Sequence, residues 1–138
     1  MIKKIMVAYD GSAQSEKAFD FALDLAQKYS AQIIVLSVAC PPEPPVAVEM
    51  QAVLEYATEY YKTRFDSLKK KADAVSIETR LDVAVGHPAE QIVHGAVKES
   101  ADMIVIGHRG ESLLQKWLLG SVAKRVLSYA LCPVLVIR

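Results

Sequence analysis

The sequence predicts an α/β fold built on an open, doubly wound, five-stranded parallel sheet with helices on both faces. Four short runs are rich in Ile and Val and lack strict alternation, which is typical of strands buried on both faces of a parallel sheet. Segments with helical periodicity separate them, so that the elements follow the order β-α-β-α-β-α-β-α-β once an alternating strand is added. With 138 residues, the chain is expected to form a single domain over residues 1–138.

Five segments are expected to form the strands. The buried strands are predicted at residues 5–9 (IMVAY), 32–38 (QIIVLSV), 102–107 (DMIVIG) and 133–138 (PVLVIR). Residues 75–85 (VSIETRLDVAV) differ, because apolar side chains alternate there with polar ones. The apolar set is Val75, Ile77, Leu81 and Val83, and the polar set is Ser76, Glu78, Arg80 and Asp82. One face of this strand is therefore expected to be wet, as in an edge strand.

Helical patterns fill the gaps between the strands. Ser12 is a suitable N-cap for the first helix, whose expected inward stripe is Ala18, Phe21, Ala22, Leu25 and Tyr29. The second helix is expected over residues 47–72, with a repeat formed by Leu54, Ala57, Tyr61, Phe65 and Leu68. The third begins at Pro88, a tolerated first position, and turns inward Ile92, Val93, Ala96 and Val97. The last begins at about Ser121, with an inward set of Val122, Val126 and Ala130.

Charge and apolar run length exclude several classes of partner. Lys and Arg together number 16, as do Asp and Glu, so no basic field favours nucleic acid or an anionic membrane. No segment approaches the ~20 apolar residues that cross a bilayer, and the N-terminal apolar run breaks at Asp10, too early for a signal peptide. We therefore expect a soluble, cytoplasmic protein in which Cys40 and Cys132 are free, partly buried thiols.

A ligand site is expected where the strand order reverses. With residues 75–85 at the edge, right-handed crossovers give the simplest winding as third, second, first, fourth and fifth strand, or 3-2-1-4-5. The reversal falls between the first strand, which ends at Tyr9-Asp10, and the fourth, which ends at Ile106-Gly107. Open α/β sheets bind ligands outside the carboxyl ends of the strands at such a switch point.

A glycine-rich loop, GHRGESLLQKWLLGS, leaves the sheet at that point. Gly107 and Gly110 lack a Cβ atom and tolerate positive φ, so their N–H groups are able to turn into the crevice. Gly120 and Ser121 offer a hydroxyl, the free amides of a helix N-terminus and its positive dipole end. The pattern G-x2-G-x9-G-S suits a polyphosphate.

The same loop has a structural alternative. It lacks the lysine of a P-loop and the G-x-G-x-x-G spacing of dinucleotide-binding turns. The glycines are then only turn formers, and Ser121 is only a helix N-cap. His108 and Arg109, which would add donors to a phosphate site, are in this alternative a surface residue and a solvated cation. Pattern alone leaves both interpretations open.

Four motifs in this order resemble the universal stress protein family. They are VAYDGS at residues 7–12, VGHPAEQIV at residues 85–93, the G-x2-G-x9-G-S spacing, and CPVLVIR at residues 132–138. The likeness extends from about Lys3 to Arg138. It implies a five-stranded sheet ordered 3-2-1-4-5, of the adenine nucleotide alpha hydrolase-like kind. Because the glycine motif is intact, it implies the ATP-binding branch of the family.

The resemblance also implies, by position, a set of binding residues for ATP or AMP. The phosphates would be held by Gly107, Gly110, Gly120, Ser121 and Val122. The same loop is lined by Ile106, His108 and Arg109. Asp10 would face the ribose or a Mg²⁺ ion bound through the phosphates. The base would be bordered by Ala8 and Tyr9 and contacted by the backbone of Val38.

Three functions compete on these residues. The leading interpretation is a nucleotide-binding regulatory domain, a stress-response switch whose state is read by an unidentified protein partner. The second is a slow ATPase in which Asp10 organises Mg²⁺, although no residue is evidently placed to orient a water. The third is a nucleotide-free dimerisation scaffold. A homodimer is expected in any case through the apolar edge from Pro133 to Arg138, which the resemblance also implies.

Overall fold

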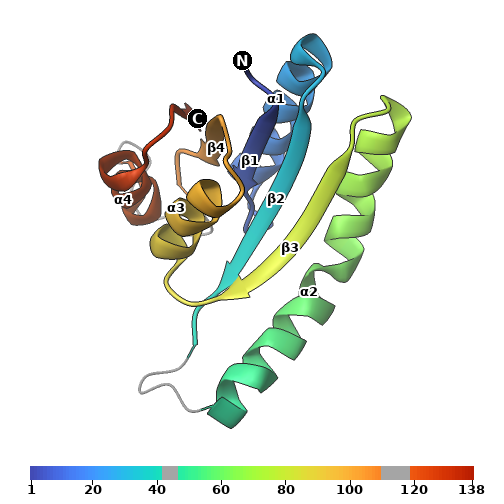
Figure 1. Cartoon of the computed structure of the whole chain (residues 1–138). Coiled ribbons are helices and arrows are strands. Elements are labelled where there is room, and N and C mark those ends of the chain that lie inside the picture. Colours follow the sequence, from blue (N-terminus) through green and yellow to red (C-terminus); the bar gives the residue numbers. More distant parts are fainter. Residues whose placement is uncertain (42–46, 110–118) are drawn as a thin grey trace.

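The strands form one parallel sheet in the order β3-β2-β1-β4-β5, and the helices cover both of its faces (Figure 1). The structure is a computed structural model that describes residues 1–41, 47–109 and 119–138. Its strands are β1 (Lys4–Ala8), β2 (Gln32–Ala39), β3 (Thr79–Val85), β4 (Met103–Gly107) and β5 (Val134–Ile137). Its helices are α1 (Ala13–Tyr29), α2 (Ala47–Ala74), α3 (Pro88–Lys98) and α4 (Ser121–Tyr129). The predicted fold class and strand order are confirmed.

The sheet separates two apolar cores. Along β1, Ile5 and Val7 pack with α1 and α2, whereas Met6 and Ala8 pack with α3 and α4. The central strands are thus buried on both faces, which explains why their sequences show no alternation. The helices that follow the two neighbouring strands β1 and β4 cover opposite faces of the sheet. Helix α1, after β1, packs on one face, and α4, after β4, packs on the other. β1 and β4 remain paired, and the divergence of the helices leaves a crevice beyond the carboxyl ends of these strands.

Strand β3 lies at the edge, as its alternating sequence predicts. It begins at Thr79 and not at Val75, because Ser76 adopts a left-handed conformation (φ 57°) in the turn that follows α2. On its wet face, Arg80 forms ion pairs with Asp82 and Glu99. The polar residues of the alternation therefore pair with each other at the edge of the sheet.

The inward stripe predicted for α1 is partly wrong. Phe21 and Tyr29 are 53% and 50% exposed, whereas Phe19 and Leu23 are buried. The helix rests on the sheet through a row of small residues (Ala18, Ala22 and Ala26), so the side chains on one flank of that row are covered and those on the other are not. The inward sets predicted for α3 and α4 are also partly wrong. Val97 of α3 is exposed, and in α4 Ala123 is buried whereas Val122 is only half-buried.

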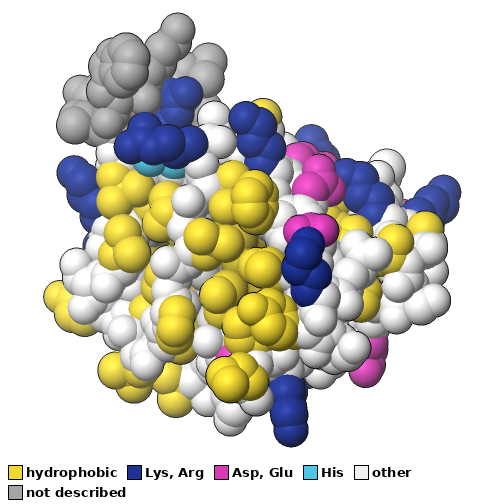
Figure 2. Space-filling view, turned by 90° about the horizontal axis from the view of Figure 1, so that it is seen from above, with side chains coloured by type: hydrophobic (Ala, Val, Ile, Leu, Met, Phe, Trp, Pro, Cys, Tyr) yellow, Lys and Arg dark blue, Asp and Glu magenta, His cyan; other side chains and the backbone are white. Residues whose placement is uncertain are grey.

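Other sequence expectations concern the surface. No helix in the described ranges has the length and apolar character needed to cross a membrane. Cys40 and Cys132 are free thiols, as expected, but Cys40 is exposed because it lies beyond the end of β2. On the face seen in Figure 2, Lys and Arg side chains stand around an apolar centre and form no continuous basic surface in that view.

Candidate functional site

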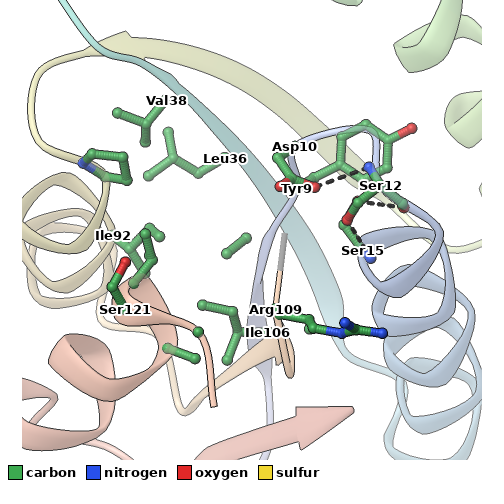
Figure 3. A pocket seen from close by; sticks show the side chains of 16 residues that line it. Tyr9, Asp10, Ser12, Ser15, Leu36, Val38, Ile92, Ile106, Arg109 and Ser121 are labelled. Atoms are coloured by element: carbon green, nitrogen blue, oxygen red, sulfur yellow. Dashed lines mark hydrogen bonds between the residues drawn. The ribbon is translucent and has the colours of Figure 1, made fainter. Parts of the chain in front are cut away.

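A pocket of about 330 Å³ lies at the carboxyl ends of β1 and β4, at the predicted switch point (Figure 3). Parallel strands that send their following helices to opposite faces leave such a crevice between them. Its walls come from β1 and the turn after it, β2, α1, α3, β4 and the start of α4. The lining residues are Ala8, Tyr9, Asp10, Ser12, Ser15, Leu36, Val38, Pro88, Ile92, Ile106, Gly107, Arg109, Gly120, Ser121, Val122 and Ala123.

One side of the pocket is an apolar slot. Figure 3 shows Leu36 and Val38 of β2 close to Ile92 of α3, opposite the polar side chains of Asp10 and Ser12. Leu36 and Val38 share a face because they are two residues apart on one strand. A flat apolar group fits between such aliphatic side chains, and a few polar groups at the other end set its orientation.

The turn that follows β1 places Asp10 in the pocket wall. Its Oδ1 accepts a hydrogen bond from the backbone N–H of Ser12 at 2.9 Å, across Gly11, whose φ is +86°. The Ser12 hydroxyl in turn caps α1 by accepting from the N–H of Ser15 at 3.2 Å. We call residues 10–12 the Asp10 turn. Its geometry is set by its own hydrogen bonds and by the left-handed glycine.

Tyr9 lines the pocket, but its ring belongs to the core on the other face of the sheet. Its ring points to the opposite face, where it packs against Tyr61 and Phe65 with centroids 6.2 and 6.3 Å away. Its hydroxyl donates to Glu16 Oε1 at 3.1 Å. Burial, together with the negative charge of Glu16, raises the pKa of Tyr9 far above its usual value. Since Ala8 lies on the pocket side of β1, it is the residue of this pair whose side chain lines the slot.

Gly107 is the last residue of β4 and lies directly against Gln14 of α1. A Cβ atom at this position would lie 2.8 Å from the Cβ of Gln14 and 3.1 Å from the carbonyl carbon of the same residue. Its φ is not among the positive values, which within the described glycines occur at Gly11 and Gly86. The expectation that Gly107 exploits positive φ is therefore wrong, because the close approach of α1 requires the glycine. Gly110 lies outside the described residues.

The N-terminus of α4 lines the pocket with three residues whose backbone N–H groups have no recorded partner among the described residues. Gly120 is its N-cap (φ −61°, ψ 153°), so Ser121 is the first helical residue and not the N-cap that sequence suggests. The first intrahelical bond runs from the N–H of Lys124 to Gly120 O at 3.0 Å, and the amides of residues 121–123 precede it. No side chain caps this end and its first turn has no acidic residue. An anion is the natural partner for such a helix end.

The two residues after Gly107 have different roles from those expected. His108 is buried and its backbone is tied on both sides, its N–H to Ile137 O and its carbonyl to the N–H of Gly120. Its burial makes the alternative assignment to the surface wrong, and it is not among the pocket-lining residues, where the resemblance implies it. Arg109 lines the pocket and extends toward α1 (Figure 3), with its Nη1 buried and without a hydrogen-bond partner among the described residues. Arg109 as a whole is half-buried, so it is at most partly solvated.

Several lining residues escaped the sequence analysis as site residues. They are Ser12, Ser15, Leu36, Pro88, Ile92 and Ala123. Leu36 follows from Val38 by strand periodicity, and Pro88 and Ile92 belong to the VGHPAEQIV motif, so a signal existed for these three. No metal-binding group of three His, Cys, Asp or Glu side chains occurs in residues 1–41, 47–109 and 119–138. An ion held by Asp10 would need further ligands from a bound molecule.

The fold and the pocket together define a doubly wound α/β domain whose switch-point pocket joins an apolar slot to unpaired donors. The sequence model described as the Universal stress protein family matches residues 1–138. The chain is 34% identical over 142 residues to Universal stress protein MJ0531 of Methanocaldococcus jannaschii, covering 100% of this chain and 83% of that protein. It is 31% identical over 150 residues to Universal stress protein YxiE of Bacillus subtilis, covering 100% of both. This chain belongs to the universal stress protein family.

Solved structures share the fold over nearly the whole chain. Hypothetical protein MJ0577 superposes with a TM-score of 0.84 at 29% identity, covering 99% of this chain and 96% of that one. A universal stress protein in complex with cAMP gives 0.75 at 27% identity, covering 99% and 97%. The universal stress protein of Archaeoglobus fulgidus in complex with dAMP gives 0.67 at 26% identity, covering 100% of both chains. Some members of the family thus bind nucleotides.

Proposed function

We propose that this protein binds an adenine nucleotide, ATP or AMP, in the switch-point pocket and acts as a regulatory domain in the stress response. Its bound or empty state would be read by a protein partner. The shape of the pocket supports the proposal, because an apolar slot for a base is joined to a polar end with donors for phosphate. The relatives that were solved with cAMP and dAMP support an adenine nucleotide in particular.

The observation that carries the proposal is the pairing of Arg109 with the start of α4. Arg109 is a pocket-lining residue with one guanidinium nitrogen buried and without an acceptor among the described residues, and residues 121–123, whose amides precede the first intrahelical bond of α4, line the same cavity. A buried cation without a partner is unfavourable, and so is a buried amide without one. A phosphate group bound between them would satisfy both.

The remaining contacts follow from this placement. Leu36, Val38 and Ile92 would enclose the base, with the backbone of Val38 at hand for its polar edge. Asp10, on the other side of the slot, would face the ribose or a Mg²⁺ ion. Mg²⁺ commonly takes one or two carboxylates and completes its shell with phosphate oxygens and water. A single carboxylate fits that ion when it arrives with the nucleotide.

Nucleotide hydrolysis would require a group that orients a water against the terminal phosphate. His108, the one histidine of the glycine-rich loop, is buried outside the pocket lining. The structure therefore offers no specific observation in favour of the ATPase alternative.

The proposal is tested by replacing the unpaired cation. Thermal unfolding of wild type and Arg109→Met is measured with and without ATP and AMP, because a ligand that binds only the native state raises apparent stability. We expect nucleotide to stabilise wild type, and Arg109→Met to lose most of that gain. Without nucleotide, Arg109→Met should be at least as stable as wild type, since an unpaired buried charge is removed.

The control is Arg125→Met, which removes an exposed cation from α4 away from the pocket lining. It should keep the wild-type response to nucleotide. The proposal fails if wild type shows no thermal shift at millimolar ATP in protein that mass spectrometry finds free of co-purified nucleotide.

A further inference from the structure

We propose that Arg64 of α2, which does not line the pocket, is a positioning residue for the Asp10 turn and thereby for Mg²⁺–nucleotide binding. The inference rests on the proposed nucleotide site. Under this inference the long helix α2 contributes to nucleotide binding, although it lies outside the glycine-rich loop motif. Besides the packing of Tyr61 and Phe65 against Tyr9, α2 approaches the pocket wall where the Arg64 side chain lies beside Gly11.

Arg64 occupies the space beside Gly11. A Cβ atom on Gly11 would lie 3.1 Å from Nε of Arg64 and 3.4 Å from its Cδ. The Nε end of Arg64 therefore fills the side-chain space of the left-handed glycine at the centre of the Asp10 turn. Asp10 and Ser12, on either side, line the pocket. The turn is thus held between the pocket and α2.

The side chain of Arg64 is itself held in place. Its Cζ lies 4.2 Å from the centroid of the Tyr60 ring, within the range of a cation–π contact. Its Nη1 donates to the backbone carbonyl of Tyr60 at 3.2 Å. Tyr60 is fixed in turn by an edge-on contact with the buried ring of Tyr61, with centroids 5.0 Å apart. These contacts set the guanidinium against Gly11 from the helix side.

Charge adds to this packing. The corner behind the Asp10 turn carries the carboxylate of Glu16, whose Oε2 is buried without a hydrogen-bond partner among the described residues. Burial and Glu16 raise the pKa of Tyr9, and the positive charge of Arg64 acts against them. The field of Arg64 therefore reaches the residue before Asp10.

The first test needs no nucleotide. Amide hydrogen exchange and ¹⁵N chemical shifts of Gly11 and Ser12 are compared in wild type, Arg64→Ala and Lys62→Ala, which removes an exposed cation from the same helix. The N–H of Ser12 is hydrogen-bonded to Asp10, so a loosened turn should expose it and speed its exchange about tenfold in Arg64→Ala. Lys62→Ala should match wild type. Wild-type exchange in Arg64→Ala overturns the inference.

The second test measures Mg²⁺–ATP affinity by calorimetry in a double-mutant cycle of Arg64→Ala with Asp10→Asn. A positioning role predicts affinity about tenfold weaker for Arg64→Ala alone and no further weakening once Asp10 is changed. Tyr60→Leu, which removes the supporting ring, should have a smaller effect in the same direction. Equal weakening in both backgrounds, or none, contradicts the inference. If wild type binds no nucleotide, the proposed function and this affinity effect both fall, while amide exchange still decides whether Arg64 orders the turn.

Discussion

Gly107 and Gly120 owe their identity to the backbone that presses against them. At Gly107 an added methyl group would meet α1 at Gln14, and at Gly120 it would lie 3.1 Å from the Cα of Arg109. Neither glycine has a left-handed conformation. A bulky substitution at either position disturbs packing before it reaches a ligand. Loss of binding in a Gly120→Val protein would therefore say little about where the phosphates lie.

Gly107→Ala should lower the free energy of unfolding by ~1–3 kcal/mol, the range for overpacking a close contact, because the backbone of α1 must move. Gly95 of α3 provides the matched control, since its added Cβ would meet only the flexible ends of Leu36 and Met6, each at 3.3 Å. Gly95→Ala should be neutral or stabilising, because Ala favours helix over Gly. Urea unfolding measures both variants. Equal effects of the two substitutions would contradict this account.

Ser121→Ala is the sharper probe of the phosphate end. Because Ser121 is the first helical residue and Gly120 the N-cap, the substitution should change stability by no more than ~0.5 kcal/mol. Binding of ATP should weaken by ~1.5–3 kcal/mol if the hydroxyl donates to a charged phosphate. Denaturant unfolding and calorimetry separate the two effects. Wild-type affinity in this variant would remove Ser121 from the binding set.

Among the elements, α1 and α4 end differently at the same pocket. The first turn of α1 is capped by the Ser12 hydroxyl and carries Glu16, whereas that of α4 has neither a side-chain cap nor an acid. In α1 the Ser12 hydroxyl accepts from the N–H of Ser15, whereas no side chain of the described residues caps the first amides of α4. Both helices follow strands that meet at the switch point, and the difference in capping supports the proposal that a phosphate would bind at α4.

A second contact between elements joins the amino ends of β1 and β4. Asp102 Oδ2 accepts from the backbone N–H groups of Lys3 at 2.8 Å and Lys4 at 3.0 Å. These bonds hold the pKa of Asp102 below its ordinary value of 3.8. A lowered folded-state pKa means that the stabilisation is complete well above pH 3.8 and is lost as the pH falls through the lower folded value.

Asp102→Asn should therefore cost ~1–3 kcal/mol of unfolding free energy at neutral pH, the scale of hydrogen bonds to a charged group. The gap between wild type and variant should close as the pH falls below 3.8. Urea unfolding over a pH series measures it, with Asp66→Asn on the exposed side of α2 as the control. A gap that is constant with pH would mean that the charge of Asp102 does not contribute.

The elements also show how far sequence reasoning reaches. The strand order and the switch point were predictable, because parallel strands and right-handed crossovers leave few alternatives. Asp10, Val38 and Ser121 line one pocket. Asp10 follows β1, Val38 lies near the end of β2, and Ser121 begins α4. The burial of His108, the path of Arg109 and the packing at Gly107 were not predictable. They depend on how closely distant backbones approach one another, which leaves no periodic mark on the sequence.

For the whole molecule, the free edge at β5 supports the proposal of a homodimer. Val134, Leu135 and Val136 are only half-buried, although they are apolar residues of a strand. Ile137 is buried in the core shared with α1, so removing residues 136–138 would damage the fold as well as the edge. Pro133 and Ile137 direct their carbonyls at β4. Because successive residues of a strand direct their backbone N–H and C=O groups to opposite sides, Val136 directs its N–H group away from β4, to the edge of the sheet.

Val136→Pro should yield a folded monomer. Proline removes the edge donor that a partner strand would use and leaves the bonds to β4 intact, as at other edge positions. Val136→Ala, which keeps the N–H group, is the control and should remain a dimer. Light scattering with size-exclusion chromatography at micromolar concentration gives the mass. A monomeric wild type, or a dimeric Val136→Pro protein, would rule out pairing through β5.

The pocket draws its walls from both sides of the reversal in strand order, from β1, β2 and α3 on one side and from β4 and α4 on the other. A molecule bound in it would contact both sides and so connect them across the boundary between β1 and β4 without a covalent bond. The β4–α4–β5 half could then not open locally without releasing that occupant, so the resistance of this half to local opening would report occupancy. A partner sensitive to how firmly the two halves are joined would need no contact with the ligand itself.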